Sequence, residues 1–67
     1  MEVKIYIEKT RLEKGLSISE LARHSGVAKS HLHYIERGEK YPTLPVLCKV
    51  AKALNTPTDE LFSYGHL

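Results

Sequence analysis

The sequence predicts an all-α fold, a compact arrangement of five short helices in a single domain of 67 residues. Two observations predict it. Apolar residues recur at the three- and four-residue spacing of a buried helix face, and glycines and capping residues divide the chain at short intervals. No segment is typical of a strand. Apolar runs never exceed three residues, which excludes a membrane span.

The first two helices are predicted from their ends. Residues 3–14 form the first helix, and Gly15 supplies the left-handed residue that stops it. The second helix begins after Ser17, because Ser17 and Glu20 have the spacing of a capping box, in which each side chain bonds the backbone N–H of the other residue. It ends just before Gly26, a residue that can adopt the positive φ of a tight turn.

The third helix, residues 29–37, completes a helix-turn-helix unit with the second. Its cap position holds Ala28 instead of Ser or Thr, a deficit of about 1 kcal/mol. A close crossing of the two helices needs a small side chain, which Ala22 supplies. The angle between them is then filled by four apolar residues, Leu21, Val27, Leu32 and Ile35. In a helix-turn-helix, the second of the two helices lies in the major groove of DNA.

The last two helices complete the predicted core, which covers residues 3–62. Thr43 caps the fourth helix, and Asn55 can close it. Its buried stripe comprises Leu44, Leu47, Val50, Ala51 and Leu54. Pro57 opens a last short helix that contains Leu61 and Phe62.

Basic residues gather in the middle of the sequence, although the formal net charge is only +2. Residues 1–22 hold four basic and four acidic residues, whereas residues 23–52 hold six basic and two acidic ones. Residues 53–67 add only Asp59 and Glu60. A basic centre fits a surface for a polyanion, and a solvated face that keeps the chain soluble explains the charge equally well.

A pattern of residues spread over residues 3–62 resembles that of a known family. The matching positions are Arg11, Gly15, Leu16, Ser17, Glu20, Leu21, Ala22, Gly26, Val27, Leu32, Ile35, Glu36, Arg37, Gly38, Pro42, Thr43, Leu47, Ala51, Leu54, Asp59, Glu60 and Leu61. With them the chain resembles the lambda-repressor-like, Cro/Xre-type bacterial and phage regulators. Within that group it is most similar to the sporulation and biofilm repressors. The resemblance implies five helices, of which the second and third read DNA.

The resemblance also implies which residues contact DNA. The base-facing residues would be Lys29, Ser30, His33 and Tyr34. The phosphate-contacting positions would be Ser17, Arg37, Lys40, Tyr41 and Thr43. Lys can donate to guanine, and Ser or His can donate or accept. Arg11 and Glu36 match a partly buried ion pair of the family, and Ile18 replaces a glutamine that often grips a phosphate.

Together these features predict a sequence-specific double-stranded DNA-binding transcriptional regulator, a repressor that reads the major groove with residues 29–37. We expect a homodimer on a palindromic operator, located in the cytoplasm with the nucleoid. We expect no secretory leader, no cofactor, no membrane partner and no enzymatic activity, the last because no nucleophile–base set or paired carboxylates are present. The alternative is a helix-turn-helix protein-interaction module, an antirepressor or antitoxin partner without DNA specificity of its own.

The remaining polar and apolar candidates are assigned structural roles. The chain has four histidines, His24, His31, His33 and His66. They lack the three- or four-residue spacing of metal ligands on a helix. Cys48 is expected to be a half-buried structural thiol. Residues 63–67 form a short tail. The subunit contact is assigned to an apolar set, Leu61, Phe62, Tyr64 and Leu67, with the rival that Leu61 and Phe62 close the core.

Overall fold

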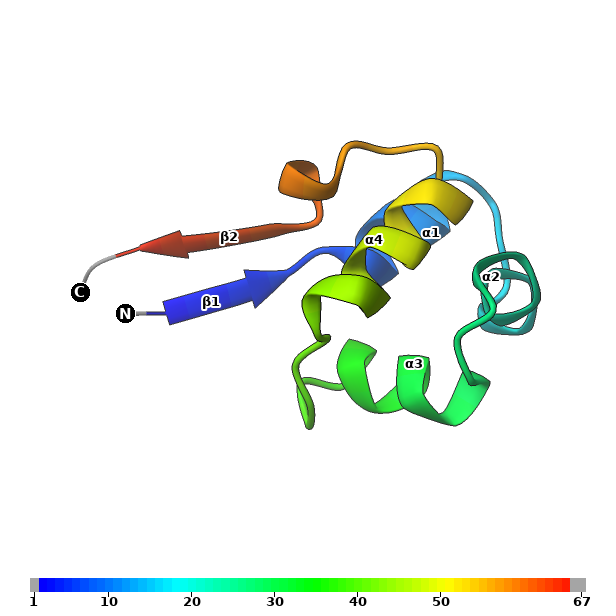
Figure 1. The fold of residues 1–67 in the computed structure, drawn as a ribbon, viewed down its shortest axis with the longest axis horizontal. Coiled ribbons are helices and arrows are strands. Elements are labelled where there is room, and N and C mark those ends of the chain that lie inside the picture. Colours follow the sequence, from blue (N-terminus) through cyan, green and yellow to red (C-terminus); the bar gives the residue numbers. More distant parts are fainter. Residues whose placement is uncertain (1, 66–67) are drawn as a thin grey trace.

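The computed structural model describes residues 2–65, in which it places four α-helices, one 3-10 turn and a two-stranded antiparallel ribbon. The helices are Ile7–Glu13 (α1), Ile18–Ser25 (α2), Lys29–Glu36 (α3) and Leu44–Ala53 (α4), and the 3-10 turn is Thr58–Glu60. The strands are Glu2–Ile5 (β1) and Phe62–Gly65 (β2). Figure 1 shows the helices packed together, with the ribbon projecting at one end of the long axis.

The predicted helical fold is confirmed for the body of the chain, but the count of five helices is wrong, because a pair of strands forms at the two ends. The first helix begins at Ile7 and not at residue 3, and the predicted last helix is reduced to one 3-10 turn, with Phe62 in a strand. The apolar side chains of Val3 and Ile5 alternate with polar neighbours, which is the two-residue period of a strand. The partner strand lies at the other end of the chain, so the pairing leaves no local signal in the sequence.

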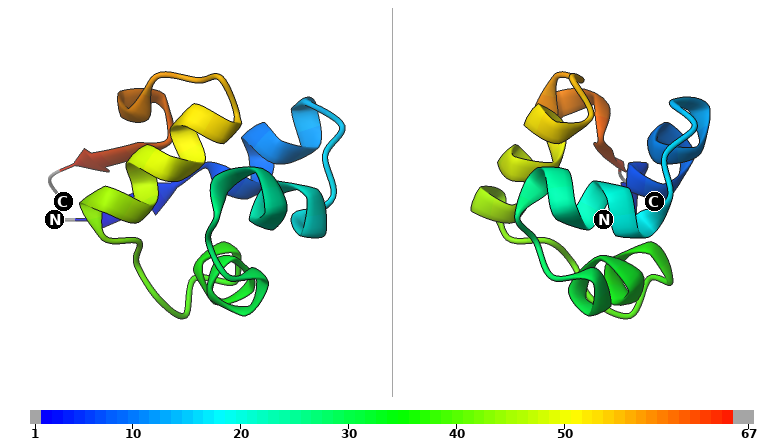
Figure 2. Two further views of the ribbon diagram at one scale, coloured as in Figure 1. Left: turned by 45° about the vertical axis from the view of Figure 1, so that its right-hand side comes forward. Right: turned by 90° about the vertical axis from the view of Figure 1, so that its right-hand side faces the viewer.

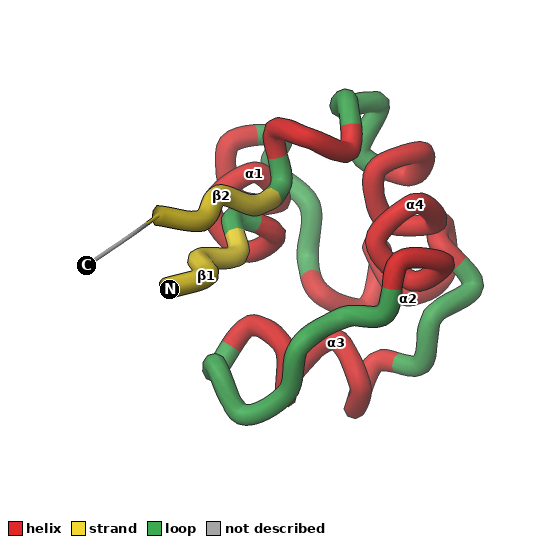
Figure 3. Tube along the Cα trace, turned by 60° about the vertical axis from the view of Figure 1, so that its left-hand side comes forward, coloured by secondary structure: helices red, strands yellow, loops and turns green. Residues whose placement is uncertain are grey.

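The ribbon joins the two ends of the described chain (Figures 1 and 3). Its ladder continues past the strands, because the backbone N–H of Tyr6 donates to the carbonyl of Leu61 at 2.8 Å. The hydroxyl of Tyr6 also lies 2.6 Å from that of Ser63. The four cross-strand pairs are Glu2 with Gly65, Val3 with Tyr64, Lys4 with Ser63 and Ile5 with Phe62.

The hydrophobic core forms between the helices and the 3-10 turn. Its buried residues are Ile7, Leu21, Val27, Leu32, Ile35, Leu47, Val50, Ala51, Leu54 and Leu61. The predicted stripe of α4 is therefore buried except for Leu44, which is 68% exposed. Leu61 closes the core, Phe62 packs partly against it, and Tyr64 is exposed. Leu67 lies outside the described residues. None of the helices described here has the length and hydropathy of a membrane span.

The predicted helix-turn-helix is confirmed as α2 and α3, which cross at a steep angle (Figure 2). The predicted capping box is also present. The Ser17 hydroxyl accepts the Glu20 N–H at 3.0 Å, and the Glu20 carboxylate accepts the Ser17 N–H at 2.9 Å. Gly26 ends α2 with a φ of 74°, a conformation that glycine adopts without strain. These contacts fix the direction in which the chain enters and leaves α2.

The capping box makes the stability of α2 depend on pH. The hydrogen bonds from Ser17 hold the pKa of the Glu20 carboxyl below its ordinary value. A carboxyl whose pKa is lower in the folded state stabilises that state above its unfolded pKa, and this stabilisation is lost as the pH falls through the folded pKa. We therefore expect Glu20 to titrate at a lower pH in the folded protein than in urea, as measured by carboxyl NMR. Ser17→Ala should remove only the hydroxyl's smaller contribution, because the backbone N–H of residue 17, the largest cause of the shift, still donates to the carboxylate in that variant. Loss of the whole difference in Ser17→Ala would contradict this assignment.

Candidate nucleic-acid interface

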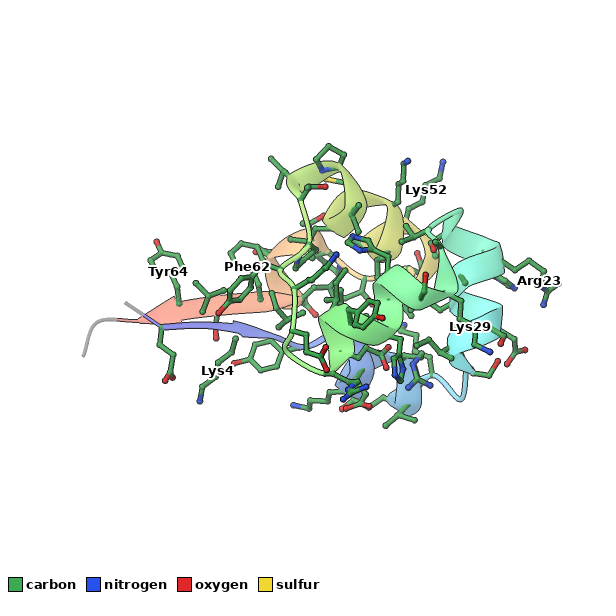
Figure 4. The ribbon with its side chains drawn as sticks, turned by 90° about the horizontal axis from the view of Figure 1, so that it is seen from below. Lys4, Arg23, Lys29, Lys52, Phe62 and Tyr64 are labelled. Carbon is green, nitrogen blue, oxygen red and sulfur yellow. The ribbon has the colours of Figure 1, made fainter. Side chains whose placement is uncertain are left out.

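The outer face of α3 is a continuous polar surface. Leu32 and Ile35 turn inward to the core, and every predicted base-facing side chain is exposed, namely Lys29, Ser30, His33 and Tyr34. The helix period produces this division, because residues three and four apart share a face. In Figure 4, which views the molecule from the side of α3, Lys29 projects at the end of the molecule opposite the ribbon.

The N-terminus of α3 has no side-chain cap. Ala28 occupies the N-cap position and makes no capping hydrogen bond, as the sequence predicts. The first backbone N–H groups of a helix have no partner within the helix, and they lie at the positive end of the helix dipole. These groups at the start of α3 can therefore donate to an acceptor on another molecule.

Aromatic and basic side chains lie together over the second half of α3. The rings of His33 and Tyr34 meet edge to face with centroids 6.2 Å apart, and the Lys40 ammonium lies 5.7 Å from the Tyr34 centroid. Arg37 contacts His33 at 3.4 Å and forms an ion pair with Glu39 at 2.9 Å. The Arg37 charge is thus partly balanced by its neighbour.

The predicted phosphate contacts fall into two kinds of position. Ser17 and Thr43 are N-caps, each accepting the backbone N–H three residues on, so both lie at helix N-termini. All five predicted side chains are exposed. Tyr41, however, lines a groove beside the ribbon together with Val3. Ile18 packs against the core, so the helix start lacks a long polar side chain at that position.

A bidentate ion pair holds the end of α3 against α1. The Nε and Nη2 atoms of Arg11 lie 2.9 and 3.0 Å from the two carboxylate oxygens of Glu36, and Nη1 donates to the Leu16 carbonyl at 2.9 Å. The two charged side chains are 11% and 4% exposed. The hydrogen bond to Glu36 raises the pKa of Arg11 above its ordinary value. Through Arg11, one guanidinium connects α1, the loop before α2, and α3.

Other candidates lie outside this surface. Cys48 is exposed and not half-buried as predicted, because it lies off the buried stripe of α4. Among residues 2–65, no three His, Cys, Asp or Glu side chains gather closely enough to hold a metal ion. Arg23 is absent from the predicted contacts, although it is exposed on α2 and projects at the same end of the molecule as Lys29 (Figure 4). In the sequence, the signal that marks Arg23 as a further candidate contact is its position on the polar face of α2.

Comparison with known sequences points to DNA-binding regulators. The sequence model of a family described as helix-turn-helix matches residues 7–61. The chain is 40% identical over 57 residues to the HTH-type transcriptional regulator SutR of Escherichia coli (strain K12), covering 85% of this chain and 32% of that protein. It is 43% identical over 61 residues to SinR of Bacillus subtilis (strain 168), covering 90% of this chain and 55% of that regulator. The chain thus spans about half or less of these relatives.

Solved structures have the same arrangement of helices. The restriction-modification controller protein C.AhdI from Aeromonas hydrophila superposes with a TM-score of 0.78 at 35% identity, covering 81% of this chain and 82% of that one. The N-terminal DNA-binding domain of SinR from Bacillus subtilis superposes with a TM-score of 0.75 at 44% identity, covering 79% and 78%.

Two ion pairs of equal length provide a matched test of burial. Glu36→Gln leaves a largely buried guanidinium without its counter-charge, and we expect it to lower the free energy of unfolding by about 3–5 kcal/mol. Glu39→Gln removes an exposed pair of the same 2.9 Å length, with side chains 59% and 45% exposed, and should cost about 0.5 kcal/mol or less. Urea denaturation of both variants measures the difference. Equal losses would show that the buried pair has no special role.

Proposed function

The chain belongs to the Cro/Xre-type helix-turn-helix family, and we propose that it is a sequence-specific double-stranded DNA-binding transcriptional regulator, a repressor that inserts α3 into the major groove. One observation carries the proposal. The outer face of α3 is fully exposed and begins with backbone N–H groups that no side chain caps. Such a helix presents donors both to base edges and to phosphates.

The proposal assigns different roles to the outer face of α3 and to the positions around that helix. Lys29, Ser30, His33 and Tyr34 would read base edges, with Lys29 at the first turn of the helix. Contacts to phosphate would come from a second set, Ser17, Arg37, Lys40, Tyr41 and Thr43. Base contacts specify sequence, whereas phosphate contacts supply affinity that depends on salt. The proposal requires no catalytic group and no cofactor.

A single domain of this size contacts one half-site. We infer that two copies bind a palindromic operator as a homodimer, with their α3 helices about 34 Å apart, one turn of DNA. A regulator of this kind acts in the cytoplasm, with the nucleoid. Both named relatives are transcriptional regulators, which supports this role without naming the operator.

The alternative of a protein-interaction module has less support. A helix that had lost DNA binding would present acidic or apolar residues outward, whereas the acidic residue of α3, Glu36, is withdrawn into the ion pair with Arg11. The exposed residues of α3 are polar, basic or aromatic, as DNA contact requires.

Three alanine substitutions separate base readers from phosphate contacts. Lys29→Ala should weaken binding to the preferred duplex by about 1–3 kcal/mol and relax selection at one base pair. Arg37→Ala and Lys40→Ala should weaken binding to all duplexes alike and reduce the slope of log K against log salt by about one for each phosphate that the variant no longer neutralises. Lys52→Ala is the matched control, because it removes an exposed charge on α4, away from α3. Titration against a selected and a scrambled duplex at two salt concentrations measures all four.

The controls decide between the alternatives. If Lys29→Ala weakens binding equally on both duplexes, Lys29 is not a base reader. If Lys52→Ala weakens binding as much as Lys40→Ala, the effect reflects net charge and not a contact. Absence of duplex binding by the wild type at low salt would reject the function, and binding to a protein partner through the same residues would favour the interaction module.

A further inference from the structure

The ribbon presents an exposed apolar face. Cross-strand pairing places Val3 beside Tyr64 and Ile5 beside Phe62 on one face. In Figure 4, Phe62 and Tyr64 project from one side of the ribbon and Lys4 from the other. This face continues into a groove that the loop before α4 completes. We call the combined surface the ribbon patch and define it as Val3, Ile5, Phe62, Tyr64, Tyr41 and Leu44, with Tyr41 at its rim, where the ring can pack while the hydroxyl stays free for the proposed phosphate contact.

The exposure of the ribbon patch is unusual for this molecule. Tyr41, Leu44 and Tyr64 are 67%, 68% and 67% exposed, the three highest values among the large hydrophobic residues that the structure describes. The strands that build most of the patch lie outside residues 7–61, the part that matches the helix-turn-helix family, whereas Tyr41 and Leu44 lie within that part. The DNA-reading helices therefore do not account for it. Contiguous apolar surface of this kind marks an interaction site.

We propose that the ribbon patch is the two-fold interface between two copies of this chain. The proposal rests on the proposed function in one respect, that two α3 helices must face the same DNA. A two-fold interface uses the same patch on both copies, and an apolar face can pack against itself in this way. Among the residues lining the groove in the described structure, only Glu2 is charged, so nearly the whole surface can lose water without stranding a charge.

The position of the ribbon patch fits the geometry of a DNA-binding dimer. In Figure 1, α3 lies on the lower side of the molecule and the ribbon projects sideways from one end. Figure 4, seen from the side of α3, shows Phe62 and Tyr64 pointing sideways and not toward the viewer. A two-fold axis beside the ribbon, parallel to the direction that α3 faces, therefore brings the patches together and leaves both α3 helices on the same side. Two molecules 36 Å long that overlap at their ribbons have centres somewhat less than one length apart, on the scale of one DNA turn.

The area available sets the strength of the dimer. A large side chain buries on the order of 150–250 Å² when fully covered, so the three exposed residues and the half-buried remainder offer roughly 500 Å² per copy. The total of about 1,000 Å² is at the lower limit for a specific interface. We therefore expect a weak dimer in solution, with a dissociation constant on the order of micromolar, that a palindromic duplex stabilises by holding both copies.

The test compares charged substitutions inside and outside the patch. Tyr64→Glu places two carboxylates close to the two-fold axis and should weaken self-association by about 100-fold. Leu44→Ser tests the other side of the groove, with a smaller effect of about tenfold. Leu12→Glu is the matched control, since Leu12 is 60% exposed on α1 and outside the patch. Sedimentation velocity at protein concentrations from low to several hundred micromolar measures association, and circular dichroism checks that each variant is folded.

Duplexes with one or two half-sites separate this proposal from the proposed function. We expect Tyr64→Glu to bind a single half-site like the wild type and to lose cooperative binding to the palindrome. A wild type that stays monomeric at the highest concentration and binds the palindrome without cooperativity would overturn the interface. So would a Leu12→Glu variant that dissociates as readily as Tyr64→Glu. If the wild type dimerises through the patch yet binds no duplex, the interface stands and the DNA-binding function fails.

Discussion

The orientation of α3, the helix proposed to enter DNA, depends on one largely buried guanidinium. Arg11 uses its Nε and Nη2 atoms for the carboxylate of Glu36 and its Nη1 atom for the carbonyl of Leu16. Each contact alone joins two segments, and together they fix the positions of α1, the start of the helix-turn-helix, and the end of α3. The hydrophobic attraction within the core is non-directional. A bidentate ion pair adds a directional constraint on how the helices are oriented.

The N-terminus of α3 has no side-chain cap, and contacts with the rest of the protein hold the helix in place. A residue at an N-cap usually stabilises its helix by about 1 kcal/mol, and α2 and α4 both have one. The helix that would meet DNA lacks it, as does α1, so its first turns are held by the burial of Leu32, and Arg11 holds the opposite end through Glu36. Local stability is thus lower where contact with another molecule would occur.

The sequence predicts the parts of this fold whose signals are local. The capping box of Ser17 and Glu20, the left-handed Gly26 and the buried stripe of α4 each depend on residues within a turn or two of one another, and all are present except that Leu44 is exposed. The ribbon is not predicted, because β1 is only four residues long and its partner begins at Phe62. The family resemblance implies the helix-turn-helix and the candidate contacts on α3, and it does not imply the ribbon, which lies outside the matched residues.

The ribbon also affects the order of folding. Its hydrogen bonds close a loop that contains every helix described here, with Tyr6 and Ser63 separated by 57 positions. Closing so long a loop in the unfolded chain costs entropy that four residue pairs alone offset poorly. We therefore expect the helices, whose contacts are nearer in sequence, to form first and to bring the strands within reach. Amide protons of the ribbon should then exchange with solvent through openings that leave the helices intact, so that the two regions are separate cooperative units.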